Sequence, residues 1–199
     1  MATWLVRAGR NGANEDFALE RGYAVVGFHE VADLRKFGSK AEISEALRAA
    51  GHNNEAAVRT HANQLWTFAH KIQQGDTIVL PLRSISAIAL GEVAGEYEHD
   101  PAASPGVQHR RPVRWLRDAV PRNAFGQDLL NTLGAFLTVC RVQRNDADQR
   151  IARIMAGHPD PGAGTVMTST GPASTDPDGD TDESIALDLE QYGRDRIAS

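Results

Sequence analysis

Residues 64–82, QLWTFAHKIQQGDTIVLPL, decide how this chain folds. Their first part, residues 64–73, is the end of a longer segment, residues 55–73. In this segment apolar residues recur at steps of three and four, as on one face of an amphipathic helix. Gly75 and Asp76 then end the helix, because glycine readily takes the backbone angles of a tight turn. The next five residues, 77–81, are typical of a buried strand with a proline at its end. The stretch therefore predicts a helix that passes directly into the core of a sheet.

On either side of this passage the chain carries short apolar segments of strand length. They are rich in β-branched and aromatic residues and are separated by turn residues. These segments are 4–8, 23–28, 87–93, 112–116 and 136–142. Gly91 lies inside one of them and predicts a β-bulge or a close approach of another chain segment. Several short strands with one strong helix favour an α+β, mainly β domain or barrel over an alternating parallel array.

The charge of the chain is unevenly distributed. Its net charge is −5, yet residues 1–155 hold 19 Lys and Arg against 17 Asp and Glu, and residues 156–199 hold 2 against 9. Residues 157–184 are rich in Gly, Pro, Ser, Thr and Asp, which is typical of a flexible, disordered acidic linker. A helical pattern returns after it. We therefore expect a domain at 1–156, a linker at 157–184 and the truncated start of a further domain at 185–199.

The sequence carries few signals for catalysis or for a membrane. Cys140 is the single cysteine, which excludes an internal disulfide and a cysteine-rich zinc site. The histidines lack zinc-ligand spacing, and there is no phosphate-binding glycine loop or acid-x-lysine nuclease pattern. No signal peptide and no apolar run of roughly 20 residues is present. We expect a soluble cytoplasmic protein that is not itself an enzyme, with no catalytic residues, metal, cofactor or membrane contact.

Four segments, taken in order, resemble the EVE-type domains of the PUA-like superfamily. They are WLVRAG at 4–9, the stretch at 64–82, AIALGEVAGEY at 87–97 and HRRPVRWL at 109–116. The resemblance covers most of residues 3–145, and it depends on the order and spacing of the segments. It implies a curved β-barrel with flanking helices that holds one flipped or splayed nucleobase. The chain lacks the family's Lys-Ser-Glu-Pro-like sequence at the first strand, which leaves the bound base open.

The two ends of the chain resemble a second group of proteins. Residues 4–28 are similar to the N-terminal domains of bacterial restriction-system proteins that carry an Mrr-like nuclease, and residues 185–197 resemble the lead-in to that nuclease. This implies the recognition part of a type IV, modification-dependent restriction endonuclease of antiphage defence. Its partners would be double-stranded DNA with a modified base and the C-terminal nuclease domain. The sequence leaves open whether the module forms a homodimer.

The resulting hypothesis is a module that flips a modified base out of DNA and directs a tethered nuclease to it. The resemblance favours 5-methylcytosine or 5-hydroxymethylcytosine, with N6-methyladenine as an alternative. An RNA reader is a second hypothesis, because PUA-like domains often serve RNA modification and translation. A self-contained enzyme that acts on nucleic acid is a third, which lacks a coherent set of catalytic side chains.

The base pocket is expected to combine aromatic faces with groups that bind the pairing edge of a base. Aromatic side chains at these positions would also suit a hydrophobic core. Tyr97 is included because of the resemblance alone. The predicted pocket residues are Trp4, Arg7, Gly9, Gln64, Trp66, Phe68, Ser84 and Tyr97.

Contacts to the DNA backbone are expected mainly from an arginine-rich window, residues 109–122. Along a strand, Arg110 and Arg114 would project to one face and Arg111 to the other. Arginine binds phosphate with a forked geometry and gives affinity that depends on salt and not on sequence. A solvated arginine-rich strand is the alternative interpretation. The predicted backbone-contacting residues are Arg10, Asn14, Arg83, Arg110, Arg111 and Arg114.

Overall fold

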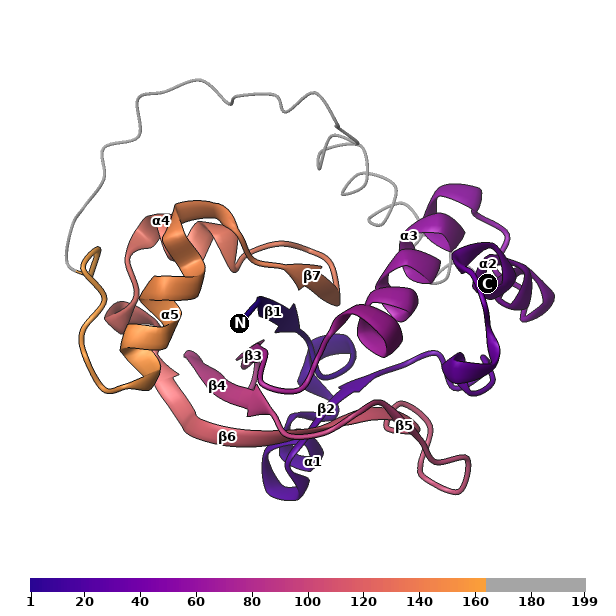
Figure 1. Cartoon of the computed structure of the whole chain (residues 1–199), viewed down its shortest axis with the longest axis horizontal. Helices are drawn as coiled ribbons and strands as arrows, with labels where there is room; N and C mark the ends of the chain where they lie inside the picture. Colours follow the sequence, from indigo (N-terminus) through magenta and orange to yellow (C-terminus); the bar gives the residue numbers. More distant parts are fainter. Residues whose placement is uncertain (164–199) are drawn as a thin grey trace.

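The computed structural model of the chain describes residues 1–163, which form an α+β fold around one curled, half-barrel sheet (Figure 1). In the described residues the sheet has seven strands in the order β2-β6-β4-β3-β1-β7, and β5 pairs with β6. β1 and β3 are parallel, and the other pairs are antiparallel. The strands are β1 (Thr3–Val6), β2 (Tyr23–Val26), β3 (Thr77–Pro81), β4 (Ala87–Val93), β5 (Glu98–His99), β6 (His109–Pro121) and β7 (Val139–Arg141).

Two pairs of helices lie at opposite ends of the sheet, α2 with α3 and α4 with α5 (Figure 1). The helices are α1 (Glu15–Arg21), α2 (Lys40–Ala49), α3 (Glu55–Trp66), α4 (Gln127–Thr132) and α5 (Ala147–Met155). Short helical turns are η1 (Arg10–Gly12), η2 (Leu34–Lys36), η3 (Thr67–Lys71), η4 (Arg122–Ala124) and η5 (Arg144–Asp146). None of the helices in residues 1–163 has the length and apolar composition that crossing a membrane requires.

The central strands are buried on both faces. Successive side chains of a strand point to opposite faces, so Trp4 and Ile78 pack with residues of α2 and α3. Leu5 and Val79 face the other way and pack with residues of α4 and α5. This double burial explains why β3 is apolar without alternation.

The helix-to-strand passage predicted from the sequence is confirmed, with one change in geometry. After Trp66 the helix widens into the π-helical turn η3 and ends at Lys71, two residues earlier than predicted. The buried carboxylate of Asp76 fixes the turn before β3 through hydrogen bonds. This carboxylate accepts hydrogen bonds of 2.8 Å from the backbone N of Ala2 and from Nε1 of Trp4. The turn therefore joins the passage to β1.

Two strands differ in length from the prediction. β6 covers 13 residues where only 112–116 were expected. Its residues 109–112 pair with β2 and β5, and its residues 113–121 pair with β4. β7 covers three residues where 136–142 were expected. Phe136 therefore lies outside the sheet, and its side chain is exposed.

The close approach predicted at Gly91 is confirmed, and the bulge lies opposite it on β6, where the step from Leu90 to Gly91 faces the two steps from Arg117 to Trp115. The register between β4 and β6 shifts on both sides of Leu90. A Cβ atom at Gly91 would collide with the side chains of Val113 and Trp115 on the neighbouring strand. Glycine at this position therefore allows the two strands to approach closely.

The folded body extends past the predicted boundary at residue 156. Asp160 is 3% exposed, and its carboxylate accepts hydrogen bonds of 2.8 and 2.7 Å from Nε and Nη2 of Arg150. Arg150 also binds the carboxylate of Asp128 on α4. A buried, paired carboxylate belongs to the packed body, so that body includes Asp160, which lies within the segment expected to be linker. The predicted linker from residue 164 and the segment 185–199 lie outside the described residues.

Candidate functional site

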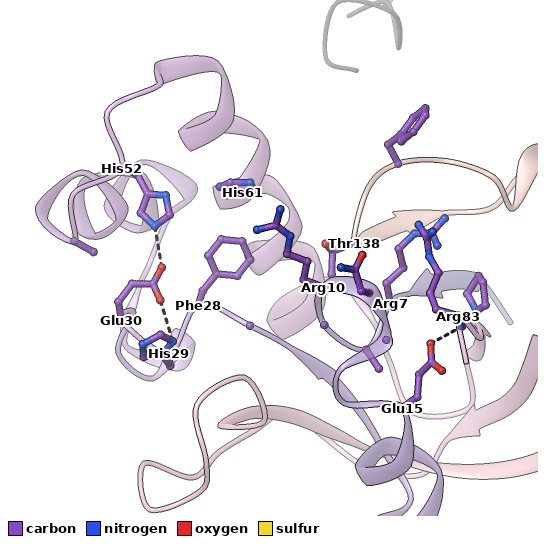
Figure 2. A pocket seen from close by; sticks show the side chains of 18 of the residues that line it. Arg7, Arg10, Glu15, Phe28, His29, Glu30, His52, His61, Arg83 and Thr138 are labelled. Carbon is purple, nitrogen blue, oxygen red and sulfur yellow. Dashed lines mark hydrogen bonds and ion pairs between the residues drawn. The ribbon is translucent and has the colours of Figure 1, made fainter. Parts of the chain in front are cut away.

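A cleft of about 790 Å³ opens at the edge of the sheet where β1 and β3 end (Figure 2). Because these strands are parallel, their carboxyl ends meet at one edge, and β7, antiparallel to β1, begins there. The chain that follows or precedes these strands therefore converges around one space. The lining residues lie within 7–12, 27–30, 50–52, 81–83 and 136–138, together with Glu15 and His61.

One end of the cleft is walled by aromatic rings. Phe28 follows β2 and has a backbone φ of 70°, which is uncommon for a bulky side chain. Its ring centroid lies 4.9 Å from that of His61, which projects from α3. The ring of His52 approaches His61 edge-on, with the centroids 5.8 Å apart. The three rings come from three separate segments of the chain.

The unusual backbone conformation of Phe28 is stabilised by a hydrogen bond from the buried side chain of His109. Nε2 of His109 lies 3.1 Å from the carbonyl oxygen of Phe28 and 3.2 Å from that of Val31. Nδ1 lies 2.6 Å from the hydroxyl of Tyr97, which accepts a hydrogen bond from the backbone N of Leu34. The Tyr97 hydroxyl therefore donates to Nδ1, and Nε2 carries the proton that both carbonyls share. Burial lowers the pKa of His109, consistent with this neutral tautomer.

His61 is the polar group of the aromatic end. Its Nδ1 is buried and has no hydrogen-bond partner among the described residues. Burial, and then the neighbouring His52, lower the pKa of His61 to about 4. His52 itself is bound to Glu30, with Nε2 2.8 Å from the carboxylate oxygen. At neutral pH His61 is uncharged, so its imidazole can donate or accept a hydrogen bond.

The other end of the cleft is cationic. Figure 2 shows Arg7 and Arg83 at this end, with Arg10 between them and the aromatic rings. Within residues 1–163 none of these three arginines forms an ion pair. The segment before β7 orients the guanidinium of Arg7, because Nη2 of Arg7 donates a hydrogen bond to the carbonyl oxygen of Ala135 at 2.6 Å. The cleft thus presents uncompensated positive charge.

Glu15 shapes the cationic end without neutralising it. Its buried carboxylate accepts hydrogen bonds from the backbone N atoms of Arg83 and Ser84, at 2.6 and 3.1 Å, and from the hydroxyl of Ser84 at 2.7 Å. Gly12 passes over this carboxylate with a φ of 79°, and a Cβ there would collide with it. The acid therefore holds the backbone of the loop that carries Arg83.

Four predicted site residues line the cleft: Arg7, Gly9, Arg10 and Arg83. Asn14 does not, since its side chain donates to the carbonyl oxygen of Gly106 at 3.3 Å. Ser84 does not line it either, and its hydroxyl is held by Glu15. The cleft therefore brings residues of the glycine turn after β1 together with Arg83.

The predicted aromatic pocket residues belong to the core. Trp4 is 8% exposed and donates to Asp76, and Phe68 is fully buried. Tyr97 is buried and bound to His109. We withdraw these three as base contacts, because a base cannot stack on a ring that has no free face.

Gln64 and Trp66 also have structural positions outside the cleft. The carbonyl oxygen of the Gln64 side chain accepts hydrogen bonds from the backbone N atoms of Thr138 and Val139, at 2.7 and 2.9 Å. This attaches β7 to α3. Trp66 is half-buried and packs against His70, with ring centroids 4.0 Å apart. We therefore withdraw both as base contacts.

The predicted arginine rows on β6 are corrected as well. Arg111 is buried and donates to the carbonyl oxygens of Phe68, Ala69 and Gly95, and burial lowers its pKa. Arg110 is paired with two acids, Glu98 and Asp100. Arg114 is exposed, but it pairs with Glu92 at 2.9 Å and lies outside the cleft. The curl of the sheet therefore turns Arg111 toward the core, and neighbouring acids pair with Arg110 and Arg114, whereas Arg117 later on the same strand is exposed.

Sequence reasoning missed the aromatic end of the cleft. His61 lies three residues after Val58 and four before Leu65, so it is a polar residue on the apolar face of α3. That position is a signal that could have identified it. Phe28 and Phe136, which also lines the cleft, gave no comparable signal. Both were expected within strands, and a strand pattern does not reveal which aromatic residue lies beyond the end of the strand.

The fold is an α+β domain whose cleft has an aromatic end and a cationic end. Within residues 1–163 no three His, Cys, Asp or Glu side chains are grouped as a metal site would require. A family model described as a domain of unknown function (DUF8426) matches residues 4–132, and the chain belongs to that family. No curated protein matches the chain. The matched region contains the whole cleft except the segment before β7.

Proposed function

We propose that this chain is a DNA-binding recognition module that holds a modified base, 5-methylcytosine or 5-hydroxymethylcytosine, flipped into the cleft. The observation that carries the proposal is the joining of an aromatic wall to unpaired arginines in one cleft. An extruded base is held by ring faces and by hydrogen bonds to its pairing edge. Its phosphates need cations, which arginine supplies in a forked geometry.

The aromatic end suits a base that carries a small apolar substituent. Phe28 offers an apolar ring for stacking and for contact with a methyl group. His61 offers a neutral nitrogen for the exocyclic amino group or ring nitrogen of the base. The cleft volume of about 790 Å³ lies within the range of about 300–1,000 Å³ typical of small-ligand sites. A nucleotide therefore fits it.

In this proposal the domain is an EVE-type member of the PUA-like superfamily. The curled mixed sheet with helices at both ends supports that relation. The partner would be an Mrr-like nuclease that follows the linker, and the chain itself would be the recognition part and not the enzyme. Its role would be to bring the nuclease to modified foreign DNA.

A second candidate function is recognition of single-stranded RNA. It is favoured by the compact arrangement of the cleft arginines, since Arg111 is buried and Arg110 is paired with acids, which leaves fewer free cations on β6 for a duplex. Sequence-specific RNA recognition commonly splays single bases onto aromatic side chains. The same aromatic end would serve that function.

A competition binding assay at one stated salt concentration tests the proposal. Matched duplexes would carry cytosine, 5-methylcytosine, 5-hydroxymethylcytosine or N6-methyladenine, with single-stranded RNA alongside. We expect one cytosine modification to be preferred by about tenfold or more, corresponding to about 1.4 kcal/mol. Preference for N6-methyladenine would change the base, stronger binding of RNA would favour the second function, and equal binding of all duplexes would refute modified-base reading.

Two variants locate the discrimination. Phe28→Gly removes the ring while tolerating the φ of 70°. We expect it to abolish the preference between duplexes. Arg153→Gln is the matched control, because Arg153 is exposed on α5 and does not line the cleft. Loss of the preference in both variants would show that the effect does not come from the cleft.

A further inference from the structure

Arg7 carries a buried hydrogen-bond donor, Nε, that no group within residues 1–163 satisfies. Its Nη2 donates to the carbonyl oxygens of Ala135 and Leu133, at 2.6 and 3.4 Å. Its Nε is buried and has no partner in the described part of the chain. Buried donors in folded proteins are almost always paired, so an unpaired guanidinium nitrogen at a cleft wall indicates an acceptor that comes from outside.

A second arginine, Arg83, lines the same end of the cleft. Arg122 does not line the cleft, but it begins η4 directly after β6, where its backbone N donates to the carbonyl oxygen of Ser86 at 3.4 Å, and its charge acts on Arg7. Burial lowers the pKa of Arg7, and the charges of Arg83 and Arg122 lower it further. Arg7 and Arg122 are half-buried, and among residues 1–163 no carboxylate pairs with any of the three.

The cluster is held in place by contacts that leave its charge free. The carbonyl of Ala135 orients the guanidinium of Arg7, and the carboxylate of Glu15 binds the backbone N of Arg83. Like charges that are held together without a counter-ion repel each other, and an anion removes this cost while gaining charge-assisted hydrogen bonds. The arrangement therefore favours a multivalent oxyanion over a neutral ligand.

We propose that Arg7 and Arg83, which line the end of the cleft opposite Phe28 and His61, form a phosphate subsite there, and that the charge of Arg122 behind them strengthens it. The subsite takes one phosphate, as a monoester or as a diester, and gives the ligand a direction. The phosphate lies at the cationic end, and the rest of the ligand extends past Arg10 toward the aromatic rings (Figure 2). The inference that this remainder is a nucleobase rests on the proposed function, whereas the phosphate subsite does not.

Calorimetric titration of the full chain tests the subsite. The probes are inorganic phosphate, deoxycytidine 5′-monophosphate and deoxycytidine, all at one ionic strength set with sodium chloride. We expect the monophosphate to bind at least tenfold more tightly than the nucleoside, and inorganic phosphate to compete with it. Equal binding of nucleotide and nucleoside, or failure of phosphate to compete, would overturn the proposal.

Variants separate the subsite from general charge. Arg83→Gln combined with Arg122→Gln should weaken binding of the monophosphate tenfold or more, and both side chains have solvent access, so the fold should persist. Arg153→Gln combined with Arg21→Gln removes two exposed arginines outside the cleft and should leave the affinity within twofold. Equal losses in the two double variants would show a nonspecific charge effect and would also overturn the subsite.

The two proposals fail in distinguishable ways. If phosphate binding depends on Arg83 and Arg122 while modified and unmodified duplexes bind equally, the subsite stands and modified-base reading falls. If one modified duplex is preferred but phosphate binding is unchanged in the double variant, the subsite falls alone. A dinucleoside monophosphate compared with the monophosphate then distinguishes an internal phosphodiester from a terminal phosphate as the source.

Discussion

Nε2 of His109 lies 3.1 Å from the carbonyl oxygen of Phe28, the residue whose left-handed backbone turns its ring into the cleft wall. His109 is fully buried on β6, and Phe28 follows β2, its neighbour in the sheet. A hydrogen bond between two residues that are 81 positions apart therefore stabilises the positive φ of Phe28, which a bulky side chain disfavours.

Replacing His109 by Ala should lower the free energy of unfolding by about 2–4 kcal/mol, because it opens a cavity and removes one hydrogen bond each from the carbonyls of Phe28 and Val31 and from the hydroxyl of Tyr97. Urea unfolding measures the change. Tyr97→Phe is the milder comparison, since it removes only the hydroxyl that donates to Nδ1. We expect a loss of about 1–2 kcal/mol for it. A His109→Ala variant as stable as the native chain would contradict the assigned network.

The stability of the fold should fall between pH 6.5 and pH 4 in a way that depends on His61. The pKa of a histidine is 6.5 in an exposed setting and about 4 for His61 in the fold, so in this window the unfolded chain binds more protons. The contribution is complete above pH 6.5 and is lost as the pH falls to about 4, by at most ~3 kcal/mol. Other groups titrate here too, including His109, whose pKa is also lowered.

The His61→Phe variant isolates this effect. It keeps an aromatic ring against Phe28 but cannot be protonated. We expect the slope of unfolding free energy against pH to be smaller for the variant between pH 6.5 and pH 4, and the two chains to respond alike above pH 7. Parallel curves across the whole range would exclude a depressed pKa at His61.

Salt dependence should separate the two ends of the cleft. Phe28→Gly should weaken binding of the preferred nucleic acid by about 1–3 kcal/mol, the range for loss of one base–aromatic stack, and leave the salt slope unchanged. Arg83→Gln should weaken all nucleic acids alike and reduce the slope of log K against log salt by about 1. Titrations at several salt concentrations measure both. A changed slope for Phe28→Gly would contradict the division of the cleft into two ends.

The ion pairs of Arg150 should carry much of the stability of the C-terminal part of the described body. Arg150→Met leaves the buried carboxylate of Asp160 without its cation and should cost about 3–5 kcal/mol in urea unfolding. Burial would raise the pKa of Asp160, but the hydrogen bonds from Arg150 and Gly126 outweigh it and lower that pKa. A chain ending at residue 156 removes this carboxylate and should be destabilised compared with one ending at residue 163. Equal stability of these two shortened chains would show that residues 157–163 do not stabilise the packed body.

Local features of the fold could be predicted well from the sequence. The apolar repeat of α3, the turn at Gly75 and Asp76 and the close approach at Gly91 each depend on a few neighbouring residues and on backbone preferences. The glycine turn after β1 was also found, and it brought Arg7 and Arg10 into the predicted site. The membership of these two residues in one cleft with Arg83 needed the parallel pairing of β1 with β3.

The errors share a physical cause. Trp4, Phe68 and Tyr97 have the side chains of a stacking site, but the same large apolar surface drives them into the core when the sheet curls over it. Arg111 was expected at the surface because arginine is usually exposed, yet three carbonyl oxygens satisfy it in the interior. Composition and spacing do not say which partner covers a side chain.

By itself, the sequence determined the elements whose formation is local: the amphipathic helix, its passage into β3, the turns and the α+β class. Only the tertiary structure decided which charged and aromatic side chains remain available to a ligand. Within residues 1–163, Arg7 and Arg83 form no ion pair at the cleft while Arg110 and Arg111 are occupied, and Phe28 and His61 line the cleft. The reason is that availability depends on what packs against a side chain, and that is set by strands and helices remote in the sequence.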